Sequence, residues 1–94
     1  MRLEKNEHAI ILSAVAKYAP YATPYLFGSR ADNSRRGGDI DLLLIGKDLT
    51  LQTIRRLKIE LKESLGDQKI DIIFEDPDMR TNFGKLIELD AIPL

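Results

Sequence analysis

Three aspartates stand out in this chain because their neighbours are apolar. Asp39 and Asp41 alternate with apolar residues in the segment DIDLLLI, and Asp71 interrupts the segment KIDIIF. Alternation along a strand places Asp39 and Asp41 on one face, roughly 6.5–7 Å apart. Like charges on one face repel each other, and a divalent cation offsets that repulsion. Carboxylate oxygens are the ligands that Mg²⁺ prefers, so we predict that Asp39, Asp41 and Asp71 are catalytic residues that hold one or two Mg²⁺ ions.

A glycine–serine pair precedes these aspartates. Gly28 and Ser29 follow the apolar run of residues 25–27. Glycine has no Cβ, which lets a phosphate approach the backbone, and the hydroxyl of Ser29 can donate a hydrogen bond. Arg30 adds positive charge at the same place. We therefore predict that Gly28, Ser29 and Arg30 bind the phosphates of a nucleotide, and that the chemistry is phosphoryl or nucleotidyl transfer.

Each of these signals also has a plain structural interpretation. An Asp-x-Asp pair often lies at the solvated end of a strand, Asp71 could be exposed on an edge strand, and Arg30 could be a surface charge. The three signals occur together in this chain, each at the edge of a predicted strand. Their combination favours a catalytic site.

The hydrophobic pattern predicts the elements that must position these residues. Helical spacing and strand alternation indicate helices over 4–19, 49–65 and 79–89, with strands over 25–27, 39–45 and 69–74. Residues 29–38 are polar and predict a loop with a helical turn. We expect an α/β (α+β) fold, in which helices flank a small mixed sheet of three to four strands.

Two apolar groups bear on packing. The second helix carries a stripe that we expect to be buried, formed by Leu51, Ile54, Leu57, Leu61 and Leu65. The chain also ends with apolar residues that could belong either to the core or to a partner surface: Ile87, Leu89, Ile92 and Leu94.

Composition limits the class of protein. The 94 residues predict one domain over 1–94, and a net charge of -1 gives no general attraction to nucleic acid or to an anionic membrane. There are no cysteines, which excludes disulfides, thiolate metal sites and cysteine nucleophiles. No apolar run approaches the ~20 residues of a membrane span. We expect a cytoplasmic protein.

The segments LFGSRADNSRRGGDIDLLLIG and KIDIIF resemble the DNA polymerase β-like nucleotidyltransferase superfamily, and within it the minimal nucleotidyltransferase (MNT) family. The family pattern is a strand, Gly-Ser, a polar loop, Asp-x-Asp on the next strand and a third aspartate on a later strand. Gly28-Ser29, Asp39-Ile40-Asp41 and Asp71 match these positions. The loop before Asp39 is one residue shorter than is usual in the family.

The resemblance implies an activity and a partner. Asp39 and Asp41 would bind the metals that bridge a triphosphate, and Asp71 would bind the second metal and help to deprotonate an attacking hydroxyl. The expected reaction transfers a nucleoside monophosphate, AMP from ATP, to a hydroxyl of a partner protein. Small members of the family often act as antitoxins of HEPN-domain toxins. We therefore expect a hetero-oligomer with a HEPN-domain protein, with a homodimer as the alternative.

Two other functions compete with this one. The chain could be a non-catalytic antitoxin, a binding module that neutralises its partner by complex formation. It could also be a metal-stabilised structural domain without a nucleotide, although Gly28-Ser29 would then be unexplained. Three repelling carboxylates kept together favour the enzyme.

Overall fold

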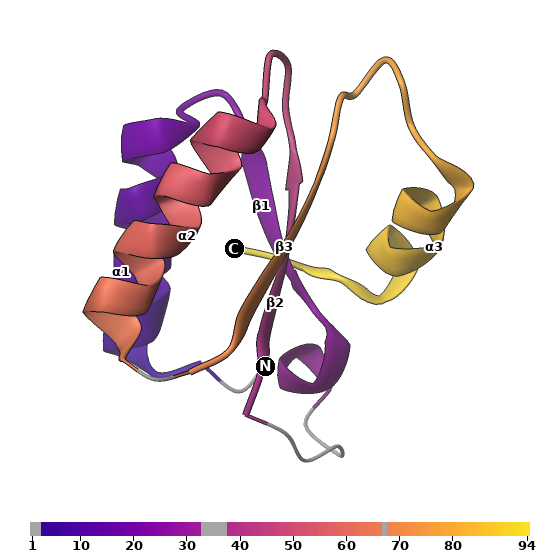
Figure 1. Ribbon diagram of the computed structural model, residues 1–94. Helices are drawn as coiled ribbons and strands as arrows, with labels where there is room; N and C mark the ends of the chain where they lie inside the picture. Colours follow the sequence, from indigo (N-terminus) through magenta and orange to yellow (C-terminus); the bar gives the residue numbers. More distant parts are fainter. Residues whose placement is uncertain (1–2, 33–37, 67) are drawn as a thin grey trace.

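A four-stranded sheet with the order β3-β2-β1-β4 forms the middle of the computed structural model, which describes residues 3–32, 38–66 and 68–94 (Figure 1). The strand β2 pairs antiparallel with β1 and parallel with β3, and β4 pairs antiparallel with β1. The strands are β1 (Thr23–Phe27), β2 (Ile40–Ile45), β3 (Ile70–Glu75) and β4 (Ile92–Pro93). The helices are α1 (Lys5–Tyr18), α2 (Leu51–Leu65) and α3 (Asn82–Asp90), with a short 3-10 helix, η1 (Gly28–Ala31). The predicted fold class, a mixed sheet flanked by helices, is confirmed.

The two faces of the sheet are covered by different helices. α1 and α2 lie side by side on one face, and α3 lies on the other (Figure 1). Ile40, Leu42 and Leu44 alternate along β2 and are fully buried in the core cluster with α1 and α2. Leu43 points to the opposite face and is also fully buried. The centre of β2 is therefore covered on both sides, as parallel pairing with β3 requires.

Helix α2 has clear start and stop residues. The side chain of Thr50 accepts a hydrogen bond from the amide of Thr53 (3.1 Å), and Gly66 follows the last turn with a φ of 81°. Ile54, Leu57 and Leu61 are buried as predicted. The prediction is wrong for Leu51, which is 55% exposed, because it lies in the first turn, at the end of the helix.

The C-terminal segment differs from the prediction in detail. α3 begins at Asn82 rather than near residue 79, and β4 was not predicted because two residues give no periodic signal. Ile92 pairs with Leu26, and Leu94 packs against the core, whereas Leu89 is 79% exposed. The apolar ending is thus divided between the sheet and the surface. No helix in the described ranges is long and apolar enough to cross a membrane.

A buried carboxylate joins β3 to α3. Glu75 is 6% exposed, and its carboxylate accepts hydrogen bonds from Nε of Arg80 (2.6 Å) and from the hydroxyl of Thr81. The same hydroxyl oxygen accepts from the amide of Gly84 (2.9 Å) and so caps α3. A Cβ at Gly84 would collide with the Glu75 carboxylate. The helix can approach β3 this closely only because residue 84 is glycine.

These contacts set the protonation state of Glu75. Burial acts to raise its pKa, but the hydrogen bonds from Thr81 and Arg80 outweigh burial and hold the pKa below its ordinary value. A lowered pKa in the folded state stabilises the fold at any pH above the unfolded value of about 4.3. That stabilisation is lost as the pH falls through the lowered folded pKa.

We predict that Glu75→Gln lowers the free energy of unfolding by roughly 1–3 kcal/mol at pH 7, because it removes a charged acceptor from a buried network. The difference from the wild type should shrink as the pH falls below about 4, where the wild-type carboxylate also becomes protonated. Urea denaturation at a series of pH values measures both effects. The exposed Glu63→Gln is the control, and a difference that does not depend on pH would contradict the assignment.

Candidate active site

One row of residues crosses the sheet at the end where β2 and β3 begin. The strand registers pair Phe27 with Asp41, and Asp41 with Asp71. Paired residues on neighbouring strands point to the same face, and this face is opposite the core of α1 and α2. Asp41 and Asp71 therefore lie side by side, both partly exposed.

Asp39 takes a different position from the other two aspartates. It precedes the first residue of β2 and is exposed to solvent. Within the three described ranges, no group of three histidine, cysteine, aspartate or glutamate side chains is close enough to hold a metal ion. The structure thus brings Asp41 and Asp71 together and leaves Asp39 at the rim. Lys69 approaches the site from the side, with its Nζ 3.9 Å from Oδ2 of Asp71.

Burial and neighbouring negative charges disfavour the ionised form of Asp41. Burial raises the pKa of Asp41 above its ordinary value, and the negative charges of Asp71 and Asp39 raise it further. The positive charge of Lys69 offsets only part of this rise in the pKa of Asp41. A set of hard carboxylate oxygens with excess negative charge suits a divalent cation such as Mg²⁺. The donor chemistry of the site therefore fits the expected metal.

Gly28 is required at its position for two reasons. Its φ of +72° is a left-handed conformation that other residues adopt at a cost. A Cβ there would collide with Oδ2 of Asp41 and lie 3.2 Å from its Cγ. The structure places the Asp41 carboxylate on the side where a Cβ of residue 28 would lie, and the predicted contact of this turn with a phosphate stays a prediction. The next residue, Ser29, is half-buried within η1. Residues 33–37 of the predicted loop lie outside the described residues.

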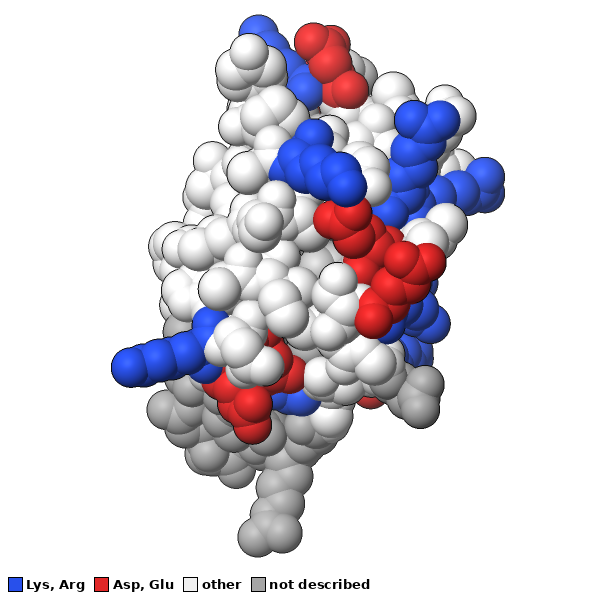
Figure 2. All heavy atoms as spheres, turned by 90° about the vertical axis from the view of Figure 1, so that its left-hand side faces the viewer, with Lys and Arg blue, Asp and Glu red and all other residues white. Residues whose placement is uncertain are grey.

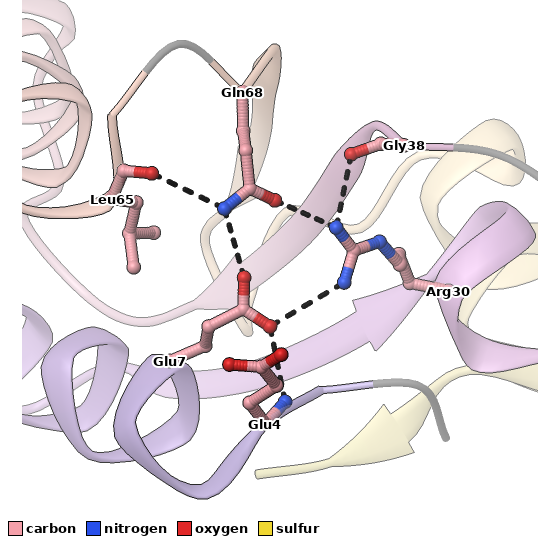
Figure 3. Close-up of polar contacts among 6 residues, drawn as sticks. All are labelled: Glu4, Glu7, Arg30, Gly38, Leu65 and Gln68. Carbon is pink, nitrogen blue, oxygen red and sulfur yellow. Dashed lines mark hydrogen bonds and ion pairs between the residues drawn. The ribbon is translucent and has the colours of Figure 1, made fainter.

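Arg30 belongs to a network that sequence reasoning missed (Figure 3). Its Nη2 donates to Oε1 of Gln68 (2.6 Å) and to the carbonyl of Gly38 (3.2 Å). Its Nη1 lies 3.5 Å from Oε1 of Glu7, and Nε2 of Gln68 donates to Oε2 of Glu7 (2.8 Å). Burial acts to raise the pKa of Glu7, but the amide of Glu4, Gln68 and the charge of Arg30 outweigh it and lower the pKa. These contacts hold the guanidinium of Arg30 against α1 and the start of β3, and its predicted contact with a phosphate stays a prediction.

A cavity of about 660 Å³ opens beside this network, with Asp39 and Lys69 among its lining residues. Among the residues that the structure describes, the face formed by α1 and α2 is mostly uncharged, and its acidic and basic side chains lie close to one another rather than in one basic patch (Figure 2). That pattern gives no electrostatic footprint for nucleic acid on this face.

Comparisons with known proteins decide the family. A model described as "Polymerase beta, Nucleotidyltransferase" matches residues 11–88. The chain belongs to this nucleotidyltransferase family. The structure of a protein assigned to the minimal nucleotidyltransferases is 32% identical, with a TM-score of 0.71, and the match covers 95% of this chain and 89% of that one. The resemblance predicted from the sequence is therefore confirmed.

More distant structures share the nucleotidyltransferase fold. A toxin–antitoxin structure with AMP-PNP is 21% identical, with a TM-score of 0.73, covering 97% of this chain and 72% of that one. A structure of tri-AMPylated HEPN toxin in complex with MNT antitoxin, from Shewanella oneidensis, is 19% identical with a TM-score of 0.72, covering 97% and 71%. At these identities the likeness shows the fold alone. A comparison with curated proteins gives no match.

We predict that Gly28→Ala destabilises the domain more than Gly66→Ala does, by about 1–3 kcal/mol. Both glycines have a positive φ, +72° and +81°, but a Cβ meets nothing within 4 Å at Gly66 and meets the Asp41 carboxylate at Gly28. The matched pair therefore separates the collision from the backbone strain. Urea denaturation of both variants measures the difference, and equal losses would show that Asp41 is not packed on Gly28.

We also predict that Asp41→Asn stabilises the folded chain in metal-free buffer by roughly 0.2–1 kcal/mol, because it removes one of two like charges paired across strands. The exposed Glu63→Gln removes the same formal charge away from the site and controls for net charge. Thermal denaturation in the presence of EDTA measures the change. A lower melting temperature for Asp41→Asn would mean that the two carboxylates do not repel each other.

Proposed function

We propose that this chain is a Mg²⁺-dependent nucleotidyltransferase that transfers AMP from ATP to a hydroxyl of a partner protein. The observation that carries the proposal is the row in which Asp41 and Asp71 lie side by side, with Gly28 packed on Asp41. Membership of the nucleotidyltransferase family supports the reaction class. Residues 1–94 would form one such domain, acting in the cytoplasm.

The three aspartates would hold one or two Mg²⁺ ions, which neutralise charge on the triphosphate and on the leaving pyrophosphate. Asp41 and Asp71 offer their oxygens from one row, and Asp39 is two residues from Asp41 at the rim. Asp71, on the edge strand β3, is open to an incoming acceptor and would take the proton from its hydroxyl. The acceptor oxygen then forms a bond to the α-phosphorus as the bond to pyrophosphate breaks.

The Gly28-Ser29 turn would bind the triphosphate. It directly follows β1, whose last residue, Phe27, pairs with Asp41. The hydroxyl of Ser29 can donate to a phosphate oxygen from this position, one residue beyond the glycine that contacts Asp41. The turn and the carboxylates would therefore hold the same triphosphate from two sides.

A HEPN-domain toxin is the partner that we propose, with this chain as its antitoxin in a hetero-oligomer. The solved complex of an MNT antitoxin with a tri-AMPylated HEPN toxin supports this choice. The surface of the C-terminal segment supports a partner as well. Large apolar side chains are 61–79% exposed there, and they are Met79, Phe83, Leu86 and Leu89.

That apolar surface also favours the second candidate, a binding module that neutralises its partner by complex formation alone. In this case, the aspartates would be dispensable for neutralisation. A homodimer through the same surface is the alternative assembly. Transfer of label to the partner separates these functions.

We predict that incubation with Mg²⁺ and ATP labelled at the α-phosphate labels the product of the neighbouring gene, whereas ATP labelled at the γ-phosphate does not. Asp41→Asn and Asp71→Asn should each reduce the transfer at least about 100-fold, because loss of a metal ligand exceeds the effect of losing its outer-shell partners. Glu63→Gln should transfer normally.

The result that overturns the enzyme is specific. If the wild type and both aspartate variants bind and neutralise the partner equally well, and none of them transfers label, the chain is a binding module. If the γ-phosphate is transferred instead, the reaction is that of a kinase.

A further inference from the structure

The network of Glu7, Arg30 and Gln68 contacts each segment that carries a candidate site residue. Arg30 is next to Ser29, and the Gly38 carbonyl that it contacts is next to Asp39. Gln68 lies three residues before Asp71. The network therefore connects these three segments, and in each segment its contact lies at most three residues from the candidate site residue.

The charged pair of the network is more shielded from solvent than an ordinary surface ion pair, although the contact of Arg30 with the Gly38 carbonyl is exposed. The side chains of Arg30 and Glu7 are 14% and 10% exposed. By comparison, Lys17 and Glu60 form a 2.7 Å ion pair between α1 and α2 with side chains that are 61% and 29% exposed. Burying charged groups is costly, so a buried pair is weak evidence for stability and better evidence for a fixed geometry. The Lys17–Glu60 pair, which also has one partner on α1, provides a more exposed comparison.

The guanidinium geometry explains why an arginine suits this place. Its planar fork presents Nη2 to two acceptors, Gln68 and the Gly38 carbonyl, while Nη1 faces Glu7. A lysine ammonium could keep the charge but lacks the fork that reaches all three partners. Gln68 completes the network, because Nε2 donates to both Glu7 (2.8 Å) and the Leu65 carbonyl (3.2 Å). The end of α2 is thereby tied to the same point.

The network also lies beside the first hydrogen bond between β2 and β3. The amide of Ile40 donates to the carbonyl of Lys69 (2.9 Å), one residue from both Gly38–Asp39 and Gln68. This bond lies at the start of both strands, one residue before Asp41 pairs with Asp71. At the other end of the strands, the amide of Gly46 donates to the carbonyl of Glu75 (3.0 Å), far from the network.

We infer that Arg30 is a positioning residue, held by Glu7 and Gln68, which fixes Ser29, Asp39 and Asp71 relative to one another. In this role Arg30 acts through its neighbours in the chain, rather than by the contact with a phosphate that the sequence predicted. The catalytic consequence rests on the proposed nucleotidyl transfer, whereas the structural consequence does not. Catalysis is sensitive to misplacement of about 1 Å, which can cost on the order of 100-fold in rate.

The first test measures transfer kinetics. Glu7→Gln, Gln68→Ala and Arg30→Lys should each lower kcat by roughly 10- to 100-fold and leave KM for ATP within about threefold of the wild type. Because the three side chains act as a unit, the double variant Glu7→Gln/Arg30→Lys should lose much less than the product of the single losses. Glu60→Gln should transfer like the wild type. Glu75→Gln, which destabilises the domain at the attachment of α3, should keep its kcat when the partner protein is saturating, and so controls for stability.

The kinetic result that overturns the inference is a selective one. If Arg30→Lys raises KM while Glu7→Gln and Gln68→Ala behave like the wild type, Arg30 binds a phosphate directly. If Glu75→Gln and Glu7→Gln lose kcat equally, the network contributes only to the general stability of the domain and does not position the site.

A second test does not need any enzymatic activity. In the chain without nucleotide, Glu7→Gln should speed hydrogen exchange of the Ile40 amide about tenfold relative to that of the Gly46 amide, measured by NMR. Glu75→Gln should not speed Ile40 exchange relative to Gly46. If no variant or wild type transfers AMP but this local effect is found, the proposed function fails and the positioning network stands. An unchanged ratio of the two exchange rates in Glu7→Gln overturns the network.

Discussion

Two carboxylates held side by side in a sheet constrain the rest of this structure. Asp41 cannot turn away from Asp71, because Ile40, Leu42 and Leu44 lock the other face of β2 into the core. A shift of β2 by one residue would expose these side chains, so burial fixes the register. The two carboxylates stay paired in this register although they repel each other. Burial of apolar side chains thus maintains an arrangement that electrostatics alone would disperse.

Strand alternation predicted much of this arrangement. The segments DIDLLLI and KIDIIF predicted β2 and β3 to within one residue at each end, and placed Asp41 and Asp71 opposite the core. The pairing of Asp41 with Asp71 and the contact of Gly28 with Asp41 depend on tertiary structure, which has no local signal. Gln68 and Glu7 are 61 residues apart, and nothing in either neighbourhood indicates their hydrogen bond.

The two ends of β3 use carboxylates in opposite ways. Near its start, Asp71 faces another acid, whereas at its end Glu75 is enclosed by Arg80, Thr81 and the backbone of Gly84. The contacts of Glu75 stabilise the attachment of α3. The repulsion between Asp71 and Asp41 is expected to lower the stability of the sheet. Such a division is common in proteins, in which functional sites store strain that the surrounding structure tolerates.

The direction of the strands has a consequence for how this site can attract an anion. Asp41 and Asp71 are second residues of parallel strands, so α2 starts at the opposite end of the sheet, after β2 has crossed it. The positive end of the α2 dipole is thus unavailable here, unlike in folds that bind phosphates at the carboxyl ends of parallel strands. α1 does begin near the site, but the Glu7 carboxylate in its first turn already accepts from the backbone amide of the N-cap residue, Glu4. In the part of the chain that the structure describes, a polyanion must therefore be attracted by bound cations and by basic side chains near the row, such as Lys69.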